Sequence, residues 1–387
     1  MLAVGLMSGT SLDGVDVVLI EIQGADGATH VKEIGFQTIP YSEELRSRIK
    51  RACDPAHALL AEVSALDMEL GYVFAGAIQA VCKTFQIDVK TLDFIASHGQ
   101  TVYHDPFVSA SNHGFVSTCQ IGNASVIAYA LNTQVISDFR VMDMVGGGQG
   151  APLVPYSEYL LYMDARKSRA LQNIGGIGNV TYIRSGSKPE DLIAFDTGPG
   201  NMMIDEAMEA LYGLSYDRGG CQASQGKLVL ALYAELCNHP YLQLVPPKST
   251  GRELFGKQMT EKILEDYHTE RPEDIIHTLT RFTAYSIASS YQHFILDHAP
   301  LDEVILAGGG AHNLALKSYL EELLAPIAVL VQEDLGYNSD SKEAVAFAIL
   351  GHETLRRHAN NVPQATGATE ELVLGNITPA PKRRYHE

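Results

Sequence analysis

The sequence has few basic segments, no paired cysteines and no long uninterrupted apolar run. Without a bilayer-length run, or a charged start leading into a signal segment, the chain is expected to stay in the cytoplasm and out of membranes. The five cysteines form no CxxC pair, which argues against a disulfide framework or a structural zinc site. A net charge of −18 repels nucleic-acid backbones. An anionic substrate would therefore need a local site of backbone amides, selected side chains and a divalent metal.

The residues that are present indicate a globular α/β protein with two domains. The 387 residues exceed the size at which one core keeps growing, and 46% of them are hydrophobic. Strand-like runs alternate with helical periodicity; apolar residues from Leu59 to Val81, for example, recur at three- and four-residue spacing, as on one face of a long helix. The glycine-rich segment 143–155 is the best candidate for a domain crossing.

The two halves of the chain begin in the same way, which suggests an old duplication. Residues 3–7 and 15–22 are predicted to form a hairpin, and residues 169–183 repeat the order strand, glycine turn, strand. In the first half, we expect further strands at 93–97 and 131–137.

In the second half, a third strand is expected to end at Asp196, before a helix over 202–211. A strand–turn–helix unit is expected over 302–324. The segment SHGQTVYH in the first half brings His98 and His104 near one another, but no third ligand stands at a zinc-like spacing. Its polar residues are better explained as contacts to a substrate.

The turn of the first hairpin has the composition of a phosphate loop. It leads into a second strand, so it is neither a P-loop nor a Rossmann turn, both of which open a helix. Small residues can still let backbone amides approach phosphate oxygens, and hydroxyls add donors, as Gly9, Thr10, Ser11 and Gly14 would. The alternative is an ordinary polar surface turn.

A carboxylate followed by a glycine turn and a helix makes Asp196 the best candidate for chemistry. A carboxylate at a strand end suits a general base or a metal ligand, and the amides at the helix start near Asn201 suit an anion. Alternatively, Asp196 only accepts hydrogen bonds from the turn amides.

Three further patterns remain open. The glycines at 308–310 remove side chains where adenine and ribose could lie, or they form a tight connection; Asn313 then caps the helix or contacts the ligand. The residues 47–50 and 248–251 match parts of β-lactamase signatures, but without an SDN element we interpret both as coincidence. In the apolar helix expected over 341–355, Glu343 is the member that could face a cleft.

Taken together, these features resemble the superfamily of actin, hexokinase and the heat-shock ATPases. More closely, the sequence resembles the anhydro-N-acetylmuramic acid kinase family. The resemblance covers Val4 to about Leu374, with the motifs in the expected order. The motifs are GLMSGTSLDGVD, SHGQTVYH, QIGN, DFRVMDMVGGGQGAPLVP, NIGGIGNV, FDTGPGN, PPKSTGRELF, AGGGAHN and the EAVAFAILG helix.

The resemblance implies an α/β fold of two actin/hexokinase-like (ribonuclease H-like) duplicated domains with an active-site cleft between the lobes. We expect domain I to comprise residues 1–130 with 360–387, and domain II residues 131–359. The implied activity uses ATP and Mg²⁺ to convert 1,6-anhydro-N-acetylmuramic acid into N-acetylmuramic acid 6-phosphate in cytoplasmic cell-wall recycling. The implied partners are small molecules, with no nucleic acid or membrane, and a homodimer is left open.

The resemblance also implies roles for single residues. Asp196 corresponds to the catalytic carboxylate. Many sugar kinases carry an aspartate at the end of the first strand, where this chain has Leu6, so Asp13, Asp16 and waters are left as candidate magnesium ligands. The implied ATP contacts are Gly9, Thr10, Ser11, Leu12, Asp13, Gly14, Val15, Asp16, Asn173, Gly175, Gly176, Gly198, Gly200, Asn201, Gly308, Gly309, Gly310 and Asn313. The implied sugar contacts are Thr10, Ser97, His98, Gly99, Gln100, Thr101, Gln120, Asp138, Arg140 and Glu343.

Two rival functions stay open at this point. One is a kinase for a different sugar or polyol, whose acceptor carries a free hydroxyl. The other is a non-catalytic nucleotide-gated protein, such as a filament former or a sugar-responsive regulator. ATP turnover with and without the anhydro sugar separates all three.

Overall fold

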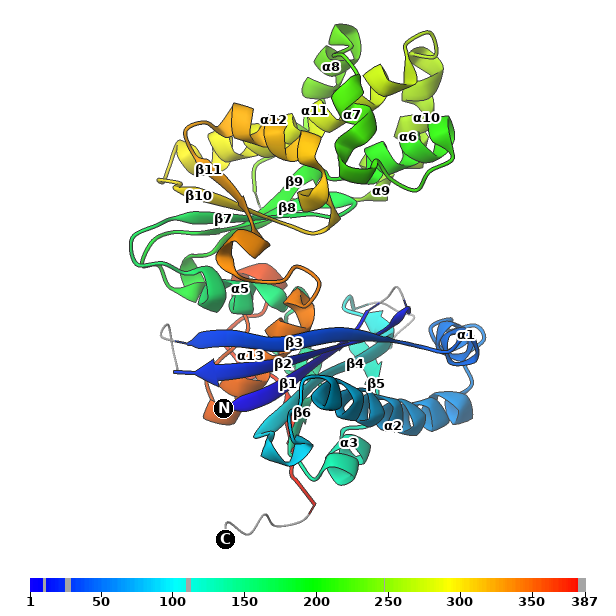
Figure 1. Ribbon diagram of the computed structural model, residues 1–387, viewed down its shortest axis with the longest axis vertical. Helices are drawn as coiled ribbons and strands as arrows, with labels where there is room; N and C mark the ends of the chain where they lie inside the picture. Colours follow the sequence, from blue (N-terminus) through cyan, green and yellow to red (C-terminus); the bar gives the residue numbers. More distant parts are fainter. Residues whose placement is uncertain (10–11, 25–28, 109–112, 247, 382–387) are drawn as a thin grey trace. The chain divides into compact units, whose positions relative to one another are not determined.

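The computed structural model describes all residues except 10–11, 25–28, 109–112, 247 and 382–387 (Figure 1). The chain forms two compact units, one of Met1–Leu161 with Asp340–Glu387 and one of Tyr162–Ser339. Each unit has its own sheet and its own helices, as expected for two α/β domains. The borders differ from those expected at 130/131 and 359/360, because strand β6 and helix α13 both pack on the first sheet.

The first unit is built on a seven-stranded mixed sheet in the order β12-β6-β4-β1-β2-β3, with β5 paired to β4 off this path. Strands β1, β2 and β3 form an antiparallel meander, and β4 runs parallel to both β1 and β6. The expected first hairpin is confirmed. The strands are β1 (Leu2–Ser8), β2 (Gly14–Gln23), β3 (His30–Pro40), β4 (Phe94–Asp105), β5 (Ser117–Ile121), β6 (Val135–Ser137) and β12 (Asn376–Thr378).

Helices cover both faces of β1 in this unit. Val4 and Leu6 lie in the core cluster with residues of α2. Gly5 points to the opposite face, where a Cβ would lie only 1.9 Å from the Ala344 carbonyl oxygen, so the missing side chain lets α13 pack closely on the strand. The helices are α1 (Glu43–Ala52), α2 (Leu60–Thr84), α3 (Ala124–Leu131), α4 (Phe139–Val145), α5 (Val154–Tyr162), α13 (Lys342–Arg356) and α14 (Pro363–Thr366).

Helix α2 confirms the periodicity of its apolar residues but corrects the expectation that no segment could span a bilayer. By length and composition alone, Leu60–Thr84 is long and apolar enough to do so. Half of its most apolar window is buried, however, and Leu66, Leu70 and Phe74 are fully buried in the core of the first unit. A core helix passes the same test of length and composition.

The second unit repeats the strand pattern of the first. Its five-stranded sheet has the order β11-β10-β7-β8-β9, with an antiparallel meander β7-β8-β9 and with β10 parallel to both β7 and β11. This matches β6-β4-β1-β2-β3 strand for strand, which supports the expected duplication. The strands are β7 (Arg169–Ile174), β8 (Ile177–Ile183), β9 (Ile193–Pro199), β10 (Glu303–Ala307) and β11 (Ala328–Val331).

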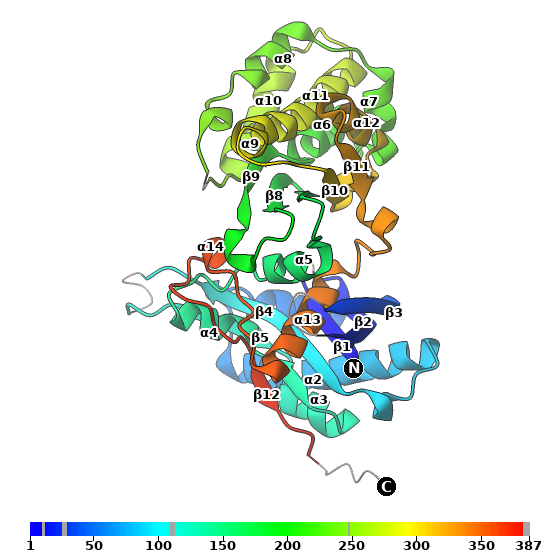
Figure 2. The same cartoon turned by 90° about the vertical axis from the view of Figure 1, so that its left-hand side faces the viewer.

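Helix α11 is the central helix of the second unit (Figure 2). It begins with Pro272 in the first turn, where the missing N–H costs nothing, and buries Ile276, Leu279 and Phe282 in the core. The helices of this unit are α6 (Met202–Tyr212), α7 (Cys221–Gln225), α8 (Leu230–Cys237), α9 (Arg252–Phe255), α10 (Lys257–Asp266), α11 (Pro272–Tyr291) and α12 (Leu314–Leu324).

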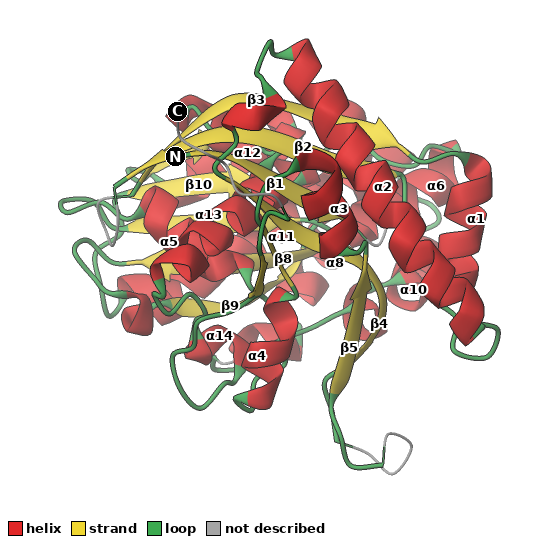
Figure 3. Cartoon of the chain, turned by 90° about the horizontal axis from the view of Figure 1, so that it is seen from below, coloured by secondary structure: helices red, strands yellow, loops and turns green. Residues whose placement is uncertain are grey.

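Three strand ends differ from the sequence expectation. Strand β4 continues through the polar SHGQTVYH segment to Asp105, because β5 pairs with it there (Figure 3). Residues 131–137 are not one strand: α3 ends at Leu131, Asn132 adopts a left-handed conformation, and only Val135–Ser137 is extended. Strand β9 does not stop at Asp196 but continues to Pro199.

Candidate active site

The turn of the first hairpin is held by side chains from two neighbouring strands. Thr10 and Ser11 lie outside the described residues. On one side of the turn, the Ser8 hydroxyl donates to Gln100 Oε1 (2.5 Å) and lies 2.6 Å from the Tyr41 hydroxyl, while Gln100 Nε2 donates to the Gly9 carbonyl (3.3 Å). On the other side, the Tyr41 amide donates to the Asp13 carbonyl (3.1 Å). Sequence reasoning missed Tyr41, which follows β3 and carries no motif signal.

The expected phosphate loop ends in the sheet rather than in solvent. Gly14 and Val15 are buried at the start of β2, and Leu12 has a left-handed backbone (φ 57°). Asp16 accepts a hydrogen bond from Thr38 Oγ1 (2.5 Å). Burial raises the pKa of Asp16, and the nearby charges of Asp13 and Asp340 raise it further.

This acidic neighbourhood fits a magnesium ion in one respect. A carboxylate whose pKa is raised by neighbouring negative charge, as that of Asp16 is, would be stabilised by a cation, and Mg²⁺ is commonly held by one or two carboxylates plus phosphate oxygens and waters. Across the described ranges, no group of three or more His, Cys, Asp or Glu side chains forms a protein-only metal cage. Asp13 and Asp16 therefore fit a metal that is brought with a phosphate ligand.

His98 and Arg140 form a buried polar pair in the first unit. His98 Nδ1 donates to the Gly99 carbonyl (2.8 Å), which leaves Nε2 to accept from Arg140 Nε (2.9 Å). Arg140 also donates to the Gly150 carbonyl (2.6 Å), and the His98 ring lies against Phe347 with centroids 4.6 Å apart. Burial, followed by the Arg140 charge, lowers the pKa of His98 to about 3. His98 is therefore neutral and orients Arg140.

Glu343 lies within the electrostatic reach of this pair, as expected for a shared site. It stands in the first turn of α13, and removal from water raises its pKa, whereas the charges of Lys342 and Arg140 oppose the rise. Ser97 Oγ and Gln120 Oε1 are buried and have no hydrogen-bond partner within the described part of the chain. Such atoms are free to bind a polar ligand.

Two other expected sugar contacts, Asp138 and Thr101, and the second histidine of SHGQTVYH have different surroundings. Asp138 accepts a hydrogen bond from Asn376 of β12 (2.8 Å), and burial raises its pKa. His104 lies 3.0 Å from the Thr118 hydroxyl, so the two histidines of SHGQTVYH have separate partners. Thr101 accepts from Gln120 Nε2 (3.2 Å).

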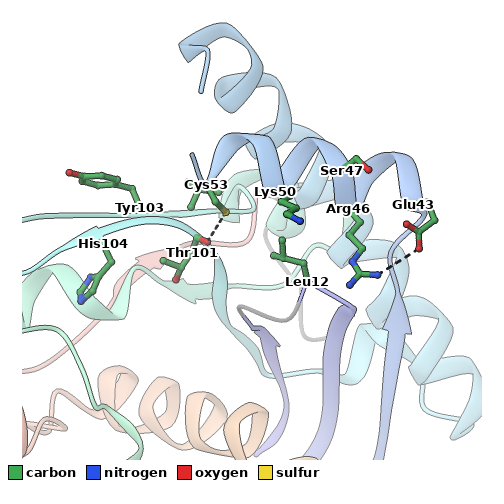
Figure 4. A pocket seen from close by; sticks show the side chains of 10 residues that line it. Leu12, Glu43, Arg46, Ser47, Lys50, Cys53, Thr101, Tyr103 and His104 are labelled. Atoms are coloured by element: carbon green, nitrogen blue, oxygen red, sulfur yellow. Dashed lines mark hydrogen bonds and ion pairs between the residues drawn. The ribbon is translucent and has the colours of Figure 1, made fainter. Parts of the chain in front are cut away.

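Thr101 also lines a cavity of about 660 Å³ between α1, Leu12 and β4 (Figure 4). Arg46 and Lys50 of α1 contribute cationic side chains to it, and Arg46 pairs with Glu43 at 3.7 Å. Ser47 and Lys50, the residues of the SxxK match, are thus part of this cavity wall.

In the second unit, the structure brings three glycine segments together. The amides of Gly200 and Asn201 donate to the carbonyls of Gly176 (2.9 Å) and Gly175 (2.7 Å). A Cβ on Gly200 would lie 2.2 Å from the Gly175 oxygen, so only glycine permits this approach. Asn201 Nδ2 donates to the Ile174 carbonyl, and the glycines 308–310 pack against the same strand end.

Gly309, the middle residue of the glycines 308–310, lines a cavity of about 650 Å³, which is large enough for a nucleoside. Asn313 lines the cavity and also caps α12, because its side chain accepts from the Leu316 amide (3.0 Å). The cap interpretation is therefore confirmed. Sequence reasoning missed other residues of the wall: His312 lies within the AGGGAHN motif but was given no role, and the others carry no such signal, namely Asp205, Tyr216 and Arg218.

Asp196 lies on β9 and is held by main-chain groups of Lys248 and Thr250 and by the Tyr241 hydroxyl. Its amide donates to the Lys248 carbonyl (3.1 Å), and its own carbonyl accepts from the Tyr241 hydroxyl (2.8 Å). The carboxylate oxygen Oδ2 accepts from the Thr250 amide (2.9 Å), whereas Oδ1 has no donor among the described residues. Burial raises the pKa of Asp196; the Thr250 hydrogen bond and the Lys248 charge oppose the rise. The donor is thus the Thr250 amide and not the glycine turn of the alternative interpretation.

Lys248 belongs to the KTG-like match that the sequence analysis interprets as coincidence, yet it contacts Asp196 through its main chain. Its side chain is 8% exposed, and Nζ has no hydrogen-bond partner among the residues the structure describes. Nζ lies 4.7 Å from the ring centroids of Tyr241 and Phe294 and 5.8 Å from that of Phe195. Burial lowers the pKa of Lys248 to about 8, against the pull of Asp196.

Comparison with known proteins decides the family. The family model for anhydro-N-acetylmuramic acid kinase matches residues 1–380. The chain belongs to this family. A relative named anhydro-N-acetylmuramic acid kinase from Clostridioides difficile (strain 630) is 50% identical over 382 residues, which cover 98% of this chain and 99% of the relative. A relative of the same name from Bacillus cereus (strain Q1) is 48% identical, with the same coverage.

Likeness to solved structures is much weaker. Component A of the Acidaminococcus fermentans (R)-2-hydroxyglutaryl-CoA dehydratase covers 90% of this chain and 96% of its own at 11% identity, with a TM-score of 0.45. A TM-score this low carries no argument about the fold, which is described by the strand order of the two sheets. The two sheets and their repeated strand order confirm the expected α/β fold of two domains.

Proposed function

We propose that the chain is a kinase that uses ATP to open and phosphorylate 1,6-anhydro-N-acetylmuramic acid. The products are N-acetylmuramic acid 6-phosphate and ADP, in the recycling of peptidoglycan. Membership of the family supports this activity. The observation that carries the mechanism is the Asp196 carboxylate, which is anchored through Oδ2 and leaves Oδ1 without a donor among the described residues.

The substrate explains why a base is needed. The sugar has no free 6-hydroxyl, because O6 is joined to C1 in an internal acetal. Water attacks C1, the C1–O6 bond breaks, and O6 bonds to the γ-phosphorus as the bond to ADP breaks. Asp196 Oδ1 takes the proton from the water, so the product carries a new hydroxyl at C1. The remaining catalysis is positioning and charge stabilisation of the phosphoryl group.

Glycine segments of both units would bind the nucleotide. We assign the phosphates to the backbone of residues 9–16 and of the turn at 175–176, because backbone amides without side chains can approach phosphate oxygens. The amides of Gly200 and Asn201 already donate to the carbonyls of Gly176 and Gly175, so the turn at 198–201 would position this second loop. The cavity beside Gly309 would take the adenosine. Asp13 and Asp16 would hold Mg²⁺, which neutralises phosphate charge when bound.

The sugar would bind through polar groups of the first unit. Arg140, oriented by His98, and Glu343 supply charged groups, and Ser97 and Gln120 supply buried oxygens that lack partners among the described residues. Gly99 and Gln100 lie on the same segment of β4. Thr101 and Asp138 also belong to the expected set, as does Thr10, which lies outside the described residues. We expect the reaction in the cytoplasm, with small molecules as the ligands.

One assay tests the function against its rivals. The purified chain is given ATP and Mg²⁺ with 1,6-anhydro-N-acetylmuramic acid, with N-acetylglucosamine, whose 6-hydroxyl is free, or with no sugar. We expect ADP only with the anhydro sugar. Faster turnover with the free-hydroxyl sugar would indicate an ordinary sugar kinase, and turnover independent of sugar would indicate a nucleotide-gated protein.

A further inference from the structure

The Lys248 amine is buried without a hydrogen-bond partner among the described residues, although removing an ammonium group from water is unfavourable. A buried ammonium usually finds a carboxylate or a carbonyl, because losing water without a partner is unfavourable. Here the neighbours of Nζ are the faces of three aromatic rings, from Phe195 on β9, from Tyr241, and from Phe294 after α11. Ring faces attract a cation without accepting a hydrogen bond.

Asp196 is the group that Lys248 acts on. Among the described titratable groups, Asp196 alone exerts a charge effect on Lys248, and Lys248 alone exerts one on Asp196. Tyr241 donates its hydroxyl to the Asp196 carbonyl, and burial raises its pKa far above neutrality, so it remains uncharged. The rings of Phe195 and Phe294 carry no charge.

We propose that Lys248 is a positioning residue for the catalytic carboxylate, whose ammonium group keeps Asp196 ionised by charge alone, without bonding to it. The inference rests on the proposed function, because it assumes that Asp196 is the base. Burial favours the protonated acid, which cannot take a proton from water, and a nearby cation favours the carboxylate.

The aromatic cage explains why the pair does not become an ordinary ion pair. A direct ammonium–carboxylate hydrogen bond would hold the Asp196 lone pairs and weaken the base. Nζ lies against the rings and has no hydrogen-bond partner among the described residues, so Oδ1 keeps its lone pairs for the attacking water. The Lys248 main chain adds position, because its carbonyl accepts from the Asp196 amide (3.1 Å).

The test is the pH dependence of a single turnover of the anhydro sugar. We compare the wild-type chain with Lys248→Met, which fills the cage without charge, and with Lys248→Arg, which retains it. Removing the charge raises the pKa of Asp196, so the acid limb of the Met variant should move to higher pH by about one unit. Its rate should fall roughly tenfold at acidic pH and match the wild type well above the limb.

Controls separate this effect from damage to the fold. Lys248→Arg and Lys262→Met, a substitution on the exposed surface of α10, should keep the wild-type acid limb. An unshifted limb in the Met variant, or an equal loss of rate at every pH, would overturn the proposal. If the Met variant does not fold, as judged by thermal melting, Lys248→Gln is used and the same outcomes decide.

The proposed function and this inference can fail separately. If Asp196→Asn keeps near-normal turnover, the base assignment is wrong. If Asp196→Asn is slow but the uncharged Lys248 variant has the wild-type limb, only the role of Lys248 is wrong.

Discussion

Replacing Asp196 with Asn removes the proposed base while keeping almost all of its local contacts. The side-chain oxygen of Asn can still accept from the Thr250 amide, as Oδ2 does at 2.9 Å. The bonds of the Asp196 main chain to Lys248 and Tyr241 do not depend on the side chain. The substitution should therefore leave the fold intact and ATP binding nearly unchanged.

The expected loss of rate follows from the role of a general base. Such groups typically contribute about 10²- to 10⁴-fold, which corresponds to roughly 3 to 5 kcal/mol of transition-state stabilisation. The cost in stability should be smaller, on the order of 1 kcal/mol, because a hydrogen bond to a charged acceptor becomes one to a neutral acceptor. A large effect on rate with a small effect on stability is therefore the signature of a catalytic role.

The assay is single-turnover formation of the sugar phosphate by Asp196→Asn, with thermal melting as the control for folding. In ¹⁸O-labelled water, the wild-type product should carry the label at O1 and none in the phosphate, because water attacks carbon rather than phosphorus. Near-normal turnover of the variant would refute the base assignment. Label in the phosphate alone would refute ring opening by water.

Three further substitutions test other parts of the site. Gly309→Val should weaken ATP binding far more than sugar binding in calorimetry, because a side chain there meets nothing closer than 3.8 Å and projects into the proposed adenosine cavity; unchanged ATP affinity would move that site elsewhere. Tyr41→Phe should raise KM for ATP several-fold and lower the free energy of unfolding by about 1 kcal/mol, because only the hydrogen bond between the Tyr41 and Ser8 hydroxyls is lost. A change in kcat alone would contradict a role of Tyr41 in holding the loop. Asp205→Asn tests the effect of the raised pKa of Asp205. Burial, followed by the negative charge of Glu206, raises this pKa to about 6. The folded state binds that proton more tightly, so stability falls as pH rises from about 4 to 6, and in urea titrations the variant should be more stable than the wild type at pH 7.5 but not at pH 3.5.

The sequence predicted those elements whose signal is local. The apolar runs on either side of the first glycine turn and the three- and four-residue spacing of apolar residues in α2 are local signals, and the hairpin and the helix they predict are both confirmed. The end of β4 was missed because its polar residues stay in the sheet only through pairing with β5, which carries no strong strand signal. The domain borders were missed for a similar reason, because the positions of β6 and α13 depend on long-range packing.

The site shows the same division between local and distant information. The glycine turns at 175–176, 198–201 and 308–310 could be predicted, since glycine is needed where backbones approach closely. The aromatic cage of Lys248 could not, because its three rings come from positions 195, 241 and 294. No sequence window contains them, and the KTG match that drew attention to Lys248 pointed to a different chemistry.

The negative net charge of the chain bears on the role of two largely buried cations, Arg140 and Lys248. At −18, the molecule as a whole repels an anionic nucleotide, so local groups such as backbone amides, a metal ion and positive charge that solvent does not screen must offset this repulsion. In each unit, a largely buried cation lies near a carboxylate of the proposed site: Arg140 near Glu343, and Lys248 near Asp196. Burial lowers the pKa of both cations, and the neighbouring carboxylate opposes the shift. Neither cation forms a direct ion pair with its neighbouring carboxylate among the described residues. Both carboxylates are therefore able to contact the substrate.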